Sequence, residues 1–424
     1  MNKKIKSKKI SFNNKRVSKK YEQAKKDILD NVCNFIEEKK DNIEEIYSFS
    51  QIKYNNYIKD ITNEEYLKYL VKVSVVILTA NEYEEKVLNY GAFSSRDKDN
   101  INNPILRINV EYNKIIRFTA YILNINNYVV LHLHAQNTGS YTFGGSGDLV
   151  RYVVENELIH PTCIISYGIC FGHDNYNQKL GDVIIAEKIY PYFMGVKLSD
   201  GTWQVKSHNY ILNMRQTCNE LYDKIEDLNN NQKFKILDSE VYFGNIITGE
   251  AVISDGFYKD IMIKASHIID PKGGDMEGYG LAKECFTYNI PCMLIKSICD
   301  WGNQKNIDQE ISQRTKVKNA KDKIQAYTSN CAFNVLKIMF ENEIFEKSEY
   351  EEYKKSVIEK FDNKCTCLMP IDDLEKAFYD KYNTMKKSYS FKKLTKVYIE
   401  KVCEVLEQDE IIIKTVRGFK NIRR

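Results

Sequence analysis

Residues 273–303 read GGDMEGYGLAKECFTYNIPCMLIKSICDWGN. The first part places Asp275 and Glu277 beside glycines, at the start of a helix predicted over 276–288. The second part is an apolar run over 291–298 that predicts a buried strand ending at Asp300. Ligand sites in open α/β sheets form beyond the carboxyl ends of strands, so Asp300 is a candidate for chemistry. An acid that only caps the next turn would occupy the same place, and position alone leaves both interpretations open.

Strands alternate with helices around this stretch, which predicts one α/β domain. A β-branched run at 71–79 is typical of a buried parallel strand. Further strands are expected at 128–134, 162–167, 182–187 and 241–247, and helices at 147–158, 211–228, 257–264 and 320–340. Some of these strands follow one another without a helix, so we expect a mixed sheet.

Two flanking regions differ from this domain in composition. Residues 1–20 hold nine Lys/Arg and no acid, and predict a basic, disordered arm. Residues 21–70 predict amphipathic helices. The central domain then spans 71–342. Residues 343–424 predict three helices (350–361, 371–382, 394–406), a strand (410–415) and a basic tail, an order that suits a winged-helix-like module binding nucleic acid or protein.

The composition limits partners and location. The 424 residues carry a net charge of +4, which does not favour nucleic acid as the main partner. We find no secretory signal and no apolar run long enough for a membrane span. Eleven cysteines, an odd number scattered through apolar segments, predict reduced thiols and a cytoplasmic protein. Cys365 and Cys367 lack the spacing and partners of a zinc site, so we expect no metal and no cofactor.

Several segments could contact a ligand. Residues 164–173 form a strand followed by glycines, which let the backbone approach a ligand closely. Residues 248–253 form a strand end and a turn, and residues 80–84 form an acidic loop after the first strand. Residues 144–148 precede a helix and suit either a tight turn or a phosphate cradle.

Taken together, these segments resemble the nucleoside phosphorylase superfamily over 71–340, and within it the 5′-methylthioadenosine/S-adenosylhomocysteine nucleosidases. The resemblance implies a three-layer α/β fold. It also implies that Glu84 positions the attacking water, that Met276 and Glu277 hold the ribose hydroxyls, and that Asp300 protonates the purine at N7.

The chemistry of N-ribosidic cleavage asks for these residue types independently. Positive charge develops on the sugar and negative charge on the base, so an acid must meet the base while a carboxylate activates water from the other side. To donate a proton near neutral pH, Asp300 needs a pKa raised by burial, which its place after an apolar strand allows.

The sequence also departs from the superfamily. Phosphorylases of this superfamily carry a Gly-Asp-Pro-x-Arg loop after the first strand, which holds phosphate. The loop in this sequence is acidic and would repel phosphate. Val252 stands where the nucleosidases place an aromatic residue that stacks on the base, and Phe171, Tyr167 or Trp301 could replace it. We expect Val252, Ile253, Phe171 and Cys299 to line the base pocket. Lys272 and Lys296 could neutralise a substrate phosphate or simply balance the acids. His134 could contact a phosphate or be a histidine of the core or pocket wall.

The leading hypothesis is a purine nucleosidase that acts on an adenine nucleoside or nucleotide, ATP included. The flanking modules also resemble those of bacterial defence effectors, and would answer to a sensor or regulatory protein. One alternative is a phosphate-dependent purine nucleoside phosphorylase. Another is an inactive regulator that senses nucleotides or binds nucleic acid. The resemblance further implies a homo-oligomer, a dimer or larger.

Overall fold

The computed structural model describes residues 15–48, 50, 57–94, 104–174, 177–192, 195–197, 203–205, 211–236, 238–250, 252–253, 256–266, 268–302, 308–364, 376–380, 395–409, 412–415 and 418–421. Its centre is a mixed sheet of eleven strands. The strands are β1 (Ile58–Asp60), β2 (Val73–Thr79), β3 (Ile105–Tyr112), β4 (Ile116–Ile125), β5 (Tyr128–His134), β6 (Cys163–Gly172), β7 (Val183–Pro191), β10 (Leu212–Asn213), β11 (Val241–Thr248), β12 (Pro271–Asp275) and β13 (Cys292–Asp300).

Four neighbouring strands run parallel in the order β5, β2, β6 and β13. Every residue of β2 is buried, which explains its run of β-branched and aliphatic side chains. Because the strands are parallel, their carboxyl ends lie at one edge of the sheet. The expected α/β class and mixed sheet are confirmed.

Five strands close into a ring. β6 pairs with β12 and β13, β12 with β11, β11 with β7, and β7 with β13. This closure brings β12 against the end of β6, where a Cβ on Gly274 would lie 2.3 Å from the ring of Phe171. Position 274 of β12 therefore requires glycine. The sequence of β12, Pro-Lys-Gly-Gly-Asp, does not by itself predict a strand.

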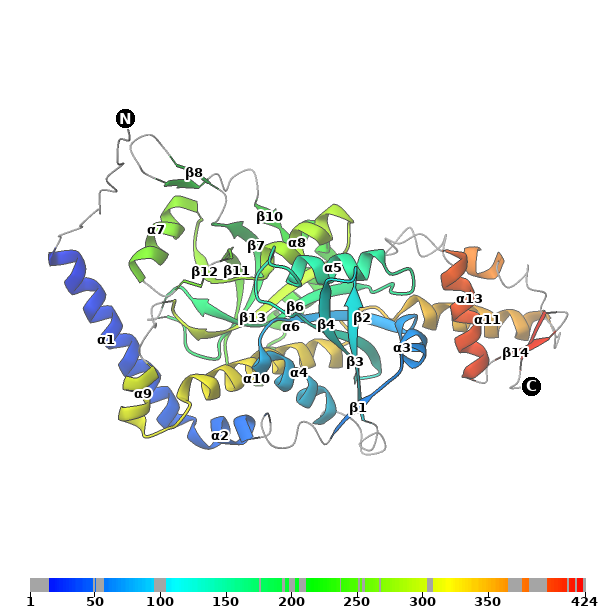
Figure 1. The fold of residues 1–424 in the computed structure, drawn as a ribbon, viewed down its shortest axis with the longest axis horizontal. Coiled ribbons are helices and arrows are strands. Elements are labelled where there is room, and N and C mark those ends of the chain that lie inside the picture. The colour runs from blue at the N-terminus through cyan, green and yellow to red at the C-terminus, as the bar shows by residue number, and fades with distance from the viewer. Residues whose placement is uncertain are drawn as a thin grey trace.

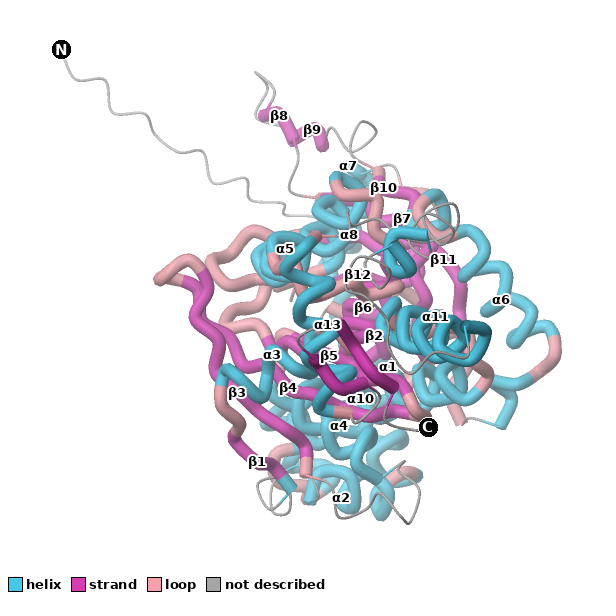
Figure 2. Tube along the Cα trace, turned by 90° about the vertical axis from the view of Figure 1, so that its right-hand side faces the viewer, coloured by secondary structure: helices cyan, strands magenta, loops and turns pink. Residues whose placement is uncertain are grey.

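Helices cover both faces of the sheet. α5 (Ser146–Glu155) and α8 (Gly278–Thr287) pack together on one face, and α4 (Glu82–Ser94) packs with α10 (Ala320–Glu341) on the other (Figures 1 and 2). The three layers implied by the family resemblance are thus present. The other helices of the domain are α6 (Asn219–Asn230), α7 (Gly256–Ser266) and α9 (Asp308–Thr315), and a small hairpin joins β8 (Gly195–Lys197) to β9 (Trp203–Val205).

The amino-terminal region contains α1 (Lys15–Glu38), α2 (Lys40–Ser48) and α3 (Asn63–Leu70). α1 begins inside the segment expected to be a disordered arm, so that expectation is wrong for 15–20, and residues 1–14 lie outside the described residues. α2 packs on α10, and α1 packs on α9. Thr62 and Glu65 form a capping box that starts α3.

The carboxyl-terminal region contains α11 (Glu349–Lys364), a helical segment at 376–380, α13 (Lys396–Gln408), and the hairpin of β14 (Ile412–Thr415) and β15 (Gly418–Asn421). Figure 1 shows α11 and α13 at the end of the molecule farthest from α1. Much of the predicted helix at 371–382 lies outside the described residues, as do Cys365 and Cys367. The winged-helix-like interpretation stays a prediction.

Two other segments differ from expectation. β3 and β4 form an antiparallel hairpin that the sequence analysis did not predict. β3 is half-exposed and carries several polar side chains, whereas residues 120–123 of β4 are all buried. The helix expected over 211–228 begins only at Asn219, since Leu212 and Asn213 pair with β7 instead.

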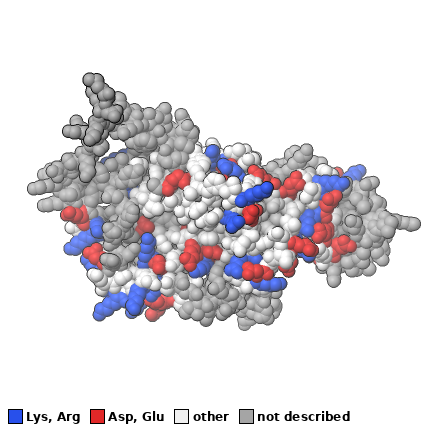
Figure 3. All heavy atoms as spheres, viewed as in Figure 1, with Lys and Arg blue, Asp and Glu red and all other residues white. Residues whose placement is uncertain are grey.

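Some general properties follow from the described residues. The nine cysteines among them are free and buried. No helix in the described part of the chain combines the length and apolar character needed to cross a membrane. Figure 3 shows basic and acidic side chains interspersed over the visible face, in keeping with the small net charge.

Candidate active site

Three predicted acids, Glu84, Glu277 and Asp300, come together beyond the carboxyl ends of β2, β12 and β13. The carboxylates of Glu84 and Glu277 lie close enough to Lys296 to act on its ammonium group. The thiol of Cys170 lies within reach of the charges of Glu84, Lys296 and Asp300. The fold thus assembles one polar cluster at the sheet edge from residues that are more than 200 positions apart in sequence.

Glu84 lies in the first turn of α4 and is 3% exposed. Its Oε2 accepts hydrogen bonds from the N–H groups of Ala80 and Asn81, each at 3.0 Å, and its Oε1 accepts one from Ile169 at 2.9 Å. Burial raises the pKa of Glu84, while the Lys296 ammonium and these N–H groups oppose the rise. A carboxylate so held suits a general base.

Gly168 makes room for that carboxylate. Its φ of +148° lies in a region that L residues rarely adopt, and a Cβ there would lie 2.0 Å from Glu84 Oε1. Glycine is therefore required at this position for two independent reasons.

Lys296 lies on β13 and is 1% exposed. Its Nζ is 3.2 Å from Glu277 Oε2 and 3.7 Å from Asp275 Oδ2. Burial alone would lower the pKa of Lys296, but the carboxylates of Glu277, Glu84 and Asp275 outweigh it and raise that pKa. We call Lys296 and these three acids the site cluster. In it, one cation is shared by three carboxyl groups.

The Met276–Glu277 segment is fixed by its neighbours. Asp275 Oδ2 accepts the N–H of Gly278 at 3.0 Å, and burial raises the pKa of Asp275 to about 6. Ser140 Oγ donates to the carbonyl of Met276 at 2.9 Å, and Ser146 Oγ donates to that of Glu277 at 2.7 Å. These contacts orient the Glu277 side chain towards Lys296.

Asp300 lies at the end of β13, in a turn that folds back on itself. Its Oδ1 accepts the N–H of Gly302 at 2.6 Å, and the Cys299 thiol lies 3.5 Å from its Oδ2. Burial raises the pKa of Asp300, against the Gly302 N–H, the Cys299 thiol and more distant cations. A carboxyl group that holds its proton at higher pH is suited to act as a general acid.

The predicted base-pocket residues separate into two groups. Phe171 and Ile253 belong to one small apolar cluster together with Tyr190 and Tyr192. Phe171 also packs against Gly302, beside the Asp300 turn. Cys299 is buried next to Asp300, but Val252 is 71% exposed and packs in neither group. Tyr192, which the sequence analysis did not single out, contacts Gly249 closely and adds an aromatic ring to this cluster.

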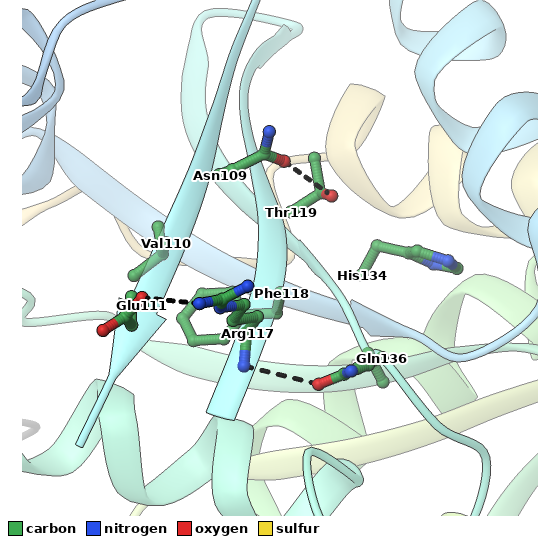
Figure 4. Close-up of a pocket in the computed structure, with 9 residues that line it drawn as sticks. Asn109, Val110, Glu111, Arg117, Phe118, Thr119, His134 and Gln136 are labelled. Atoms are coloured by element: carbon green, nitrogen blue, oxygen red, sulfur yellow. Dashed lines mark hydrogen bonds and ion pairs between the residues drawn. The ribbon is translucent and has the colours of Figure 1, made fainter. Parts of the chain in front are cut away.

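The three residues considered for phosphate binding lie apart. Lys296 is enclosed by carboxylates, and Lys272 forms an ion pair with Asp270 at 2.9 Å. His134 Nδ1 is 2.9 Å from the Thr79 hydroxyl, and the side chain lines a hollow of about 590 Å³ across β3, β4 and β5 (Figure 4). The structure does not bring these three side chains to one place.

The loop after β5 carries a further anchor. Glu250 Oε1 accepts the N–H groups of Ser140 and Tyr141, each at 2.9 Å, so it ties this loop to the end of β11. Asp148 accepts the N–H of Gly144 at 2.9 Å, so an acid already occupies the turn at the start of α5. The 144–148 segment therefore forms a tight turn closed by its own carboxylate.

Sequence reasoning missed the roles of Asp275 and Gly168, and for Lys296 it left open whether this side chain meets a phosphate or balances the acids. A lysine inside an otherwise apolar strand was the available signal for Lys296, since an isolated buried ammonium must be paired. No group of three His, Cys, Asp or Glu side chains suited to a metal ion occurs among the residues that the structure describes.

The sequence model of the phosphorylase superfamily matches residues 109–331, more than half of the chain. A death domain-containing ATP nucleosidase from Amphimedon queenslandica is 23% identical over 188 residues, which are 40% of this chain and 34% of that protein. The match thus spans about a third of this relative's length.

Two solved structures from Helicobacter pylori also align. One is a 5′-methylthioadenosine/S-adenosylhomocysteine nucleosidase, with 14% identity, a TM-score of 0.46, and coverage of 64% of this chain and 99% of that one. The other is a futalosine hydrolase, with 14% identity, a TM-score of 0.46, and coverage of 64% and 98%. From the extent of the sequence match, the chain belongs to the phosphorylase superfamily.

Proposed function

We propose that the protein hydrolyses the N-ribosidic bond of an adenine nucleoside or nucleotide. The observation that carries this proposal is the excess of acid in the site cluster, where Glu84, Glu277 and Asp275 share Lys296. A phosphate dianion would be repelled there, whereas water would not. The cluster therefore favours hydrolysis over phosphorolysis.

The assigned roles give a balanced reaction. Asp300 donates its carboxyl proton to N7 of the purine while the C1′–N9 bond breaks and its electron pair leaves with the base. Glu277 accepts hydrogen bonds from the 2′- and 3′-hydroxyls, and these strengthen as the ribose becomes cationic. A water molecule attacks C1′ and gives a proton to Glu84. The products are free base and ribose, or ribose phosphate.

The excess of carboxylates also suits the transition state. Before reaction, the negative charges in the site cluster repel one another, with only Lys296 to offset them. The positive charge that develops on the sugar relieves this repulsion, so the cluster binds the transition state better than the ground state.

The named activity of the Amphimedon queenslandica relative supports an ATP-type substrate. The helices on both sides of the domain support a regulated effector, such as a defence protein, that answers to a sensor or regulatory protein. We further propose that it acts in the cytoplasm and as a homo-oligomer. Light scattering of the purified full-length chain tests the oligomer.

The decisive experiment is incubation of the full-length protein with a panel of purine nucleosides and nucleotides, with and without inorganic phosphate. We expect free adenine to form without phosphate, as detected by chromatography. Base release that requires phosphate would make the protein a phosphorylase. If no base were released from any substrate in either condition, the proposal of an active enzyme would fail.

A further inference from the structure

Lys259 is a buried lysine that the reaction described above does not use. It lies on α7, is 7% exposed, and its Nζ donates to the carbonyl of Trp301 at 2.7 Å. Burying an ammonium group without a partner costs free energy, and the hydrogen bond to Trp301 supplies that partner. The bond therefore fixes the position of the Lys259 side chain.

The group that Lys259 holds belongs to the turn carrying Asp300. Gly302 has a φ of +63° and donates its N–H to Asp300 Oδ1 at 2.6 Å. A Cβ on Gly302 would lie 3.4 Å from the Cδ of Lys259, so the lysine chain packs directly on this turn. Two contacts therefore hold the turn: the Gly302 N–H bonds Asp300, and Lys259 bonds the carbonyl of Trp301.

We propose that Lys259 is a positioning residue for Asp300: it fixes the 300–302 turn through the Trp301 carbonyl and stabilises the carboxylate left after proton transfer. This proposal rests on the proposed nucleosidase function and assigns a residue of α7 to the same site. When the proton has moved from Asp300 to the purine, a new negative charge remains in a partly buried place. Of the two lysines whose charges reach Asp300, Lys259 has the larger effect, ahead of Lys321.

The charged groups around the turn agree with this role. The titratable groups that act on Asp300 are the Cys299 thiol on β13, Lys259 on α7 and Lys321 on α10, and both lysines lower the pKa of Asp300 against the dominant effect of burial. The groups that act on Lys259 are Asp260, Asp300 and Asp174. Burial is the main cause that lowers the pKa of His173, and the Lys259 ammonium lowers it further.

Two substitutions separate position from charge. Lys259→Gln keeps a hydrogen-bond donor for the Trp301 carbonyl but removes the charge, whereas Lys259→Arg keeps the charge. Lys264→Met, an exposed lysine on the same helix, is the matched control. The measurements are kcat for base release across pH, and circular dichroism to show that each variant folds.

We expect kcat to fall about 10- to 100-fold in Lys259→Gln, because the variant lacks the positive charge that stabilises the Asp300 carboxylate after proton transfer. Removing a nearby positive charge raises the pKa of Asp300, so the alkaline limb of the pH profile should move to higher pH. Lys259→Arg should keep the wild-type limb, and Lys264→Met should change neither quantity. A fall in kcat without movement of the limb, or no change at all, would overturn the proposal.

A second measurement does not need activity. Trp301 is one of only two tryptophans, so replacing Trp203 by Phe leaves Trp301 as the fluorescent reporter beside Asp300. Its emission should titrate with Asp300, lose that transition in Asp300→Asn, and show a higher midpoint in Lys259→Gln. An unchanged midpoint would contradict the role of Lys259, whereas an inactive wild type with a shifted midpoint would count only against the nucleosidase function.

Discussion

Two lysines of this protein, the half-buried Lys72 and the buried Lys296, meet carboxylates in opposite ways. Lys72 lies 2.8 and 2.7 Å from the two oxygens of Asp409, and the Tyr350 hydroxyl donates to the same carboxylate at 2.6 Å. We call these three residues the docking cluster, because it joins the α/β domain to the carboxyl-terminal helices. In the site cluster, by contrast, Lys296 is shared among three acids, and its nearest oxygen is 3.2 Å away.

The difference separates a structural ion pair from a reactive one. The docking cluster is balanced, with one cation, one anion and a neutral donor, and its bonds are short. The site cluster holds more negative charge than Lys296 can pair, and this excess lowers the stability of the folded protein. The excess becomes favourable only when a positive charge appears beside it. The nearby His160–Glu349 contact of 2.8 Å, with His160 stacked on Tyr398, is a second short contact that holds the same helices.

The largest effect should come from Asp300→Asn, which removes the proposed acid and keeps its shape. We expect kcat for base release to fall about 10²–10⁴-fold, the usual contribution of a general acid. Chromatography of free base gives the rate. Base release at the wild-type rate would remove Asp300 from the mechanism.

Glu84→Gln should follow, because it removes the proposed base but can still accept the Ala80 and Asn81 hydrogen bonds. We expect a loss of about 10²–10³-fold in kcat. Glu85→Gln, at the adjacent position in α4, is the matched control and should stay active, since Glu85 pairs with His134 outside the site cluster. Equal losses in both variants would point to damage of α4 rather than to loss of a base.

Lys296→Met tests the comparison directly. It leaves three buried acids without a cation, so we expect the free energy of unfolding to fall by about 3–5 kcal/mol. Lys72→Met breaks a pair that is 22% and 32% exposed, and should cost about 1 kcal/mol. Urea unfolding followed by circular dichroism measures both. A larger loss for Lys72→Met would reverse the distinction between the two clusters.

The smallest effect should be a pH dependence that comes from Asp275. Its pKa is about 6 in the folded protein against an ordinary value of 3.8, so the folded state holds this proton more tightly than the unfolded state. Its contribution to stability is therefore present at acid pH and is lost as the pH rises from about 4 to about 6. The unfolding free energy of Asp275→Asn should fall less across this window than that of wild type. Parallel curves would contradict the raised pKa.

How much of this was predictable depends on the kind of signal. β2, β5 and β13 were predicted because strands buried on both faces are continuously apolar. β3 was not predicted, because it is half-exposed and carries polar residues. β12 was not predicted either, because Gly273 and Gly274 are selected by contacts with β6 that the sequence does not display. Tertiary approach decided the secondary structure in both cases.

The site shows the same division. The resemblance located Glu84, Glu277 and Asp300, whose roles remain proposals. It did not reveal that Lys296 joins Glu277, nor that Lys259 reaches the Asp300 turn from a helix about 40 positions earlier. Those contacts depend on which way side chains point after the five-strand ring closes, and no local pattern encodes that direction.

Gly168 has a consequence for heredity. A Gly-to-Ala change requires only one nucleotide substitution in any glycine codon, and a methyl group at this position would occupy the space of the Glu84 carboxylate. Such an allele would encode every acid of the site and yet displace the one assigned to water. Lineages that lose the proposed activity can therefore do so through a codon whose product carries no reactive atom, and a search for inactive descendants should inspect position 168 as closely as 84 or 300.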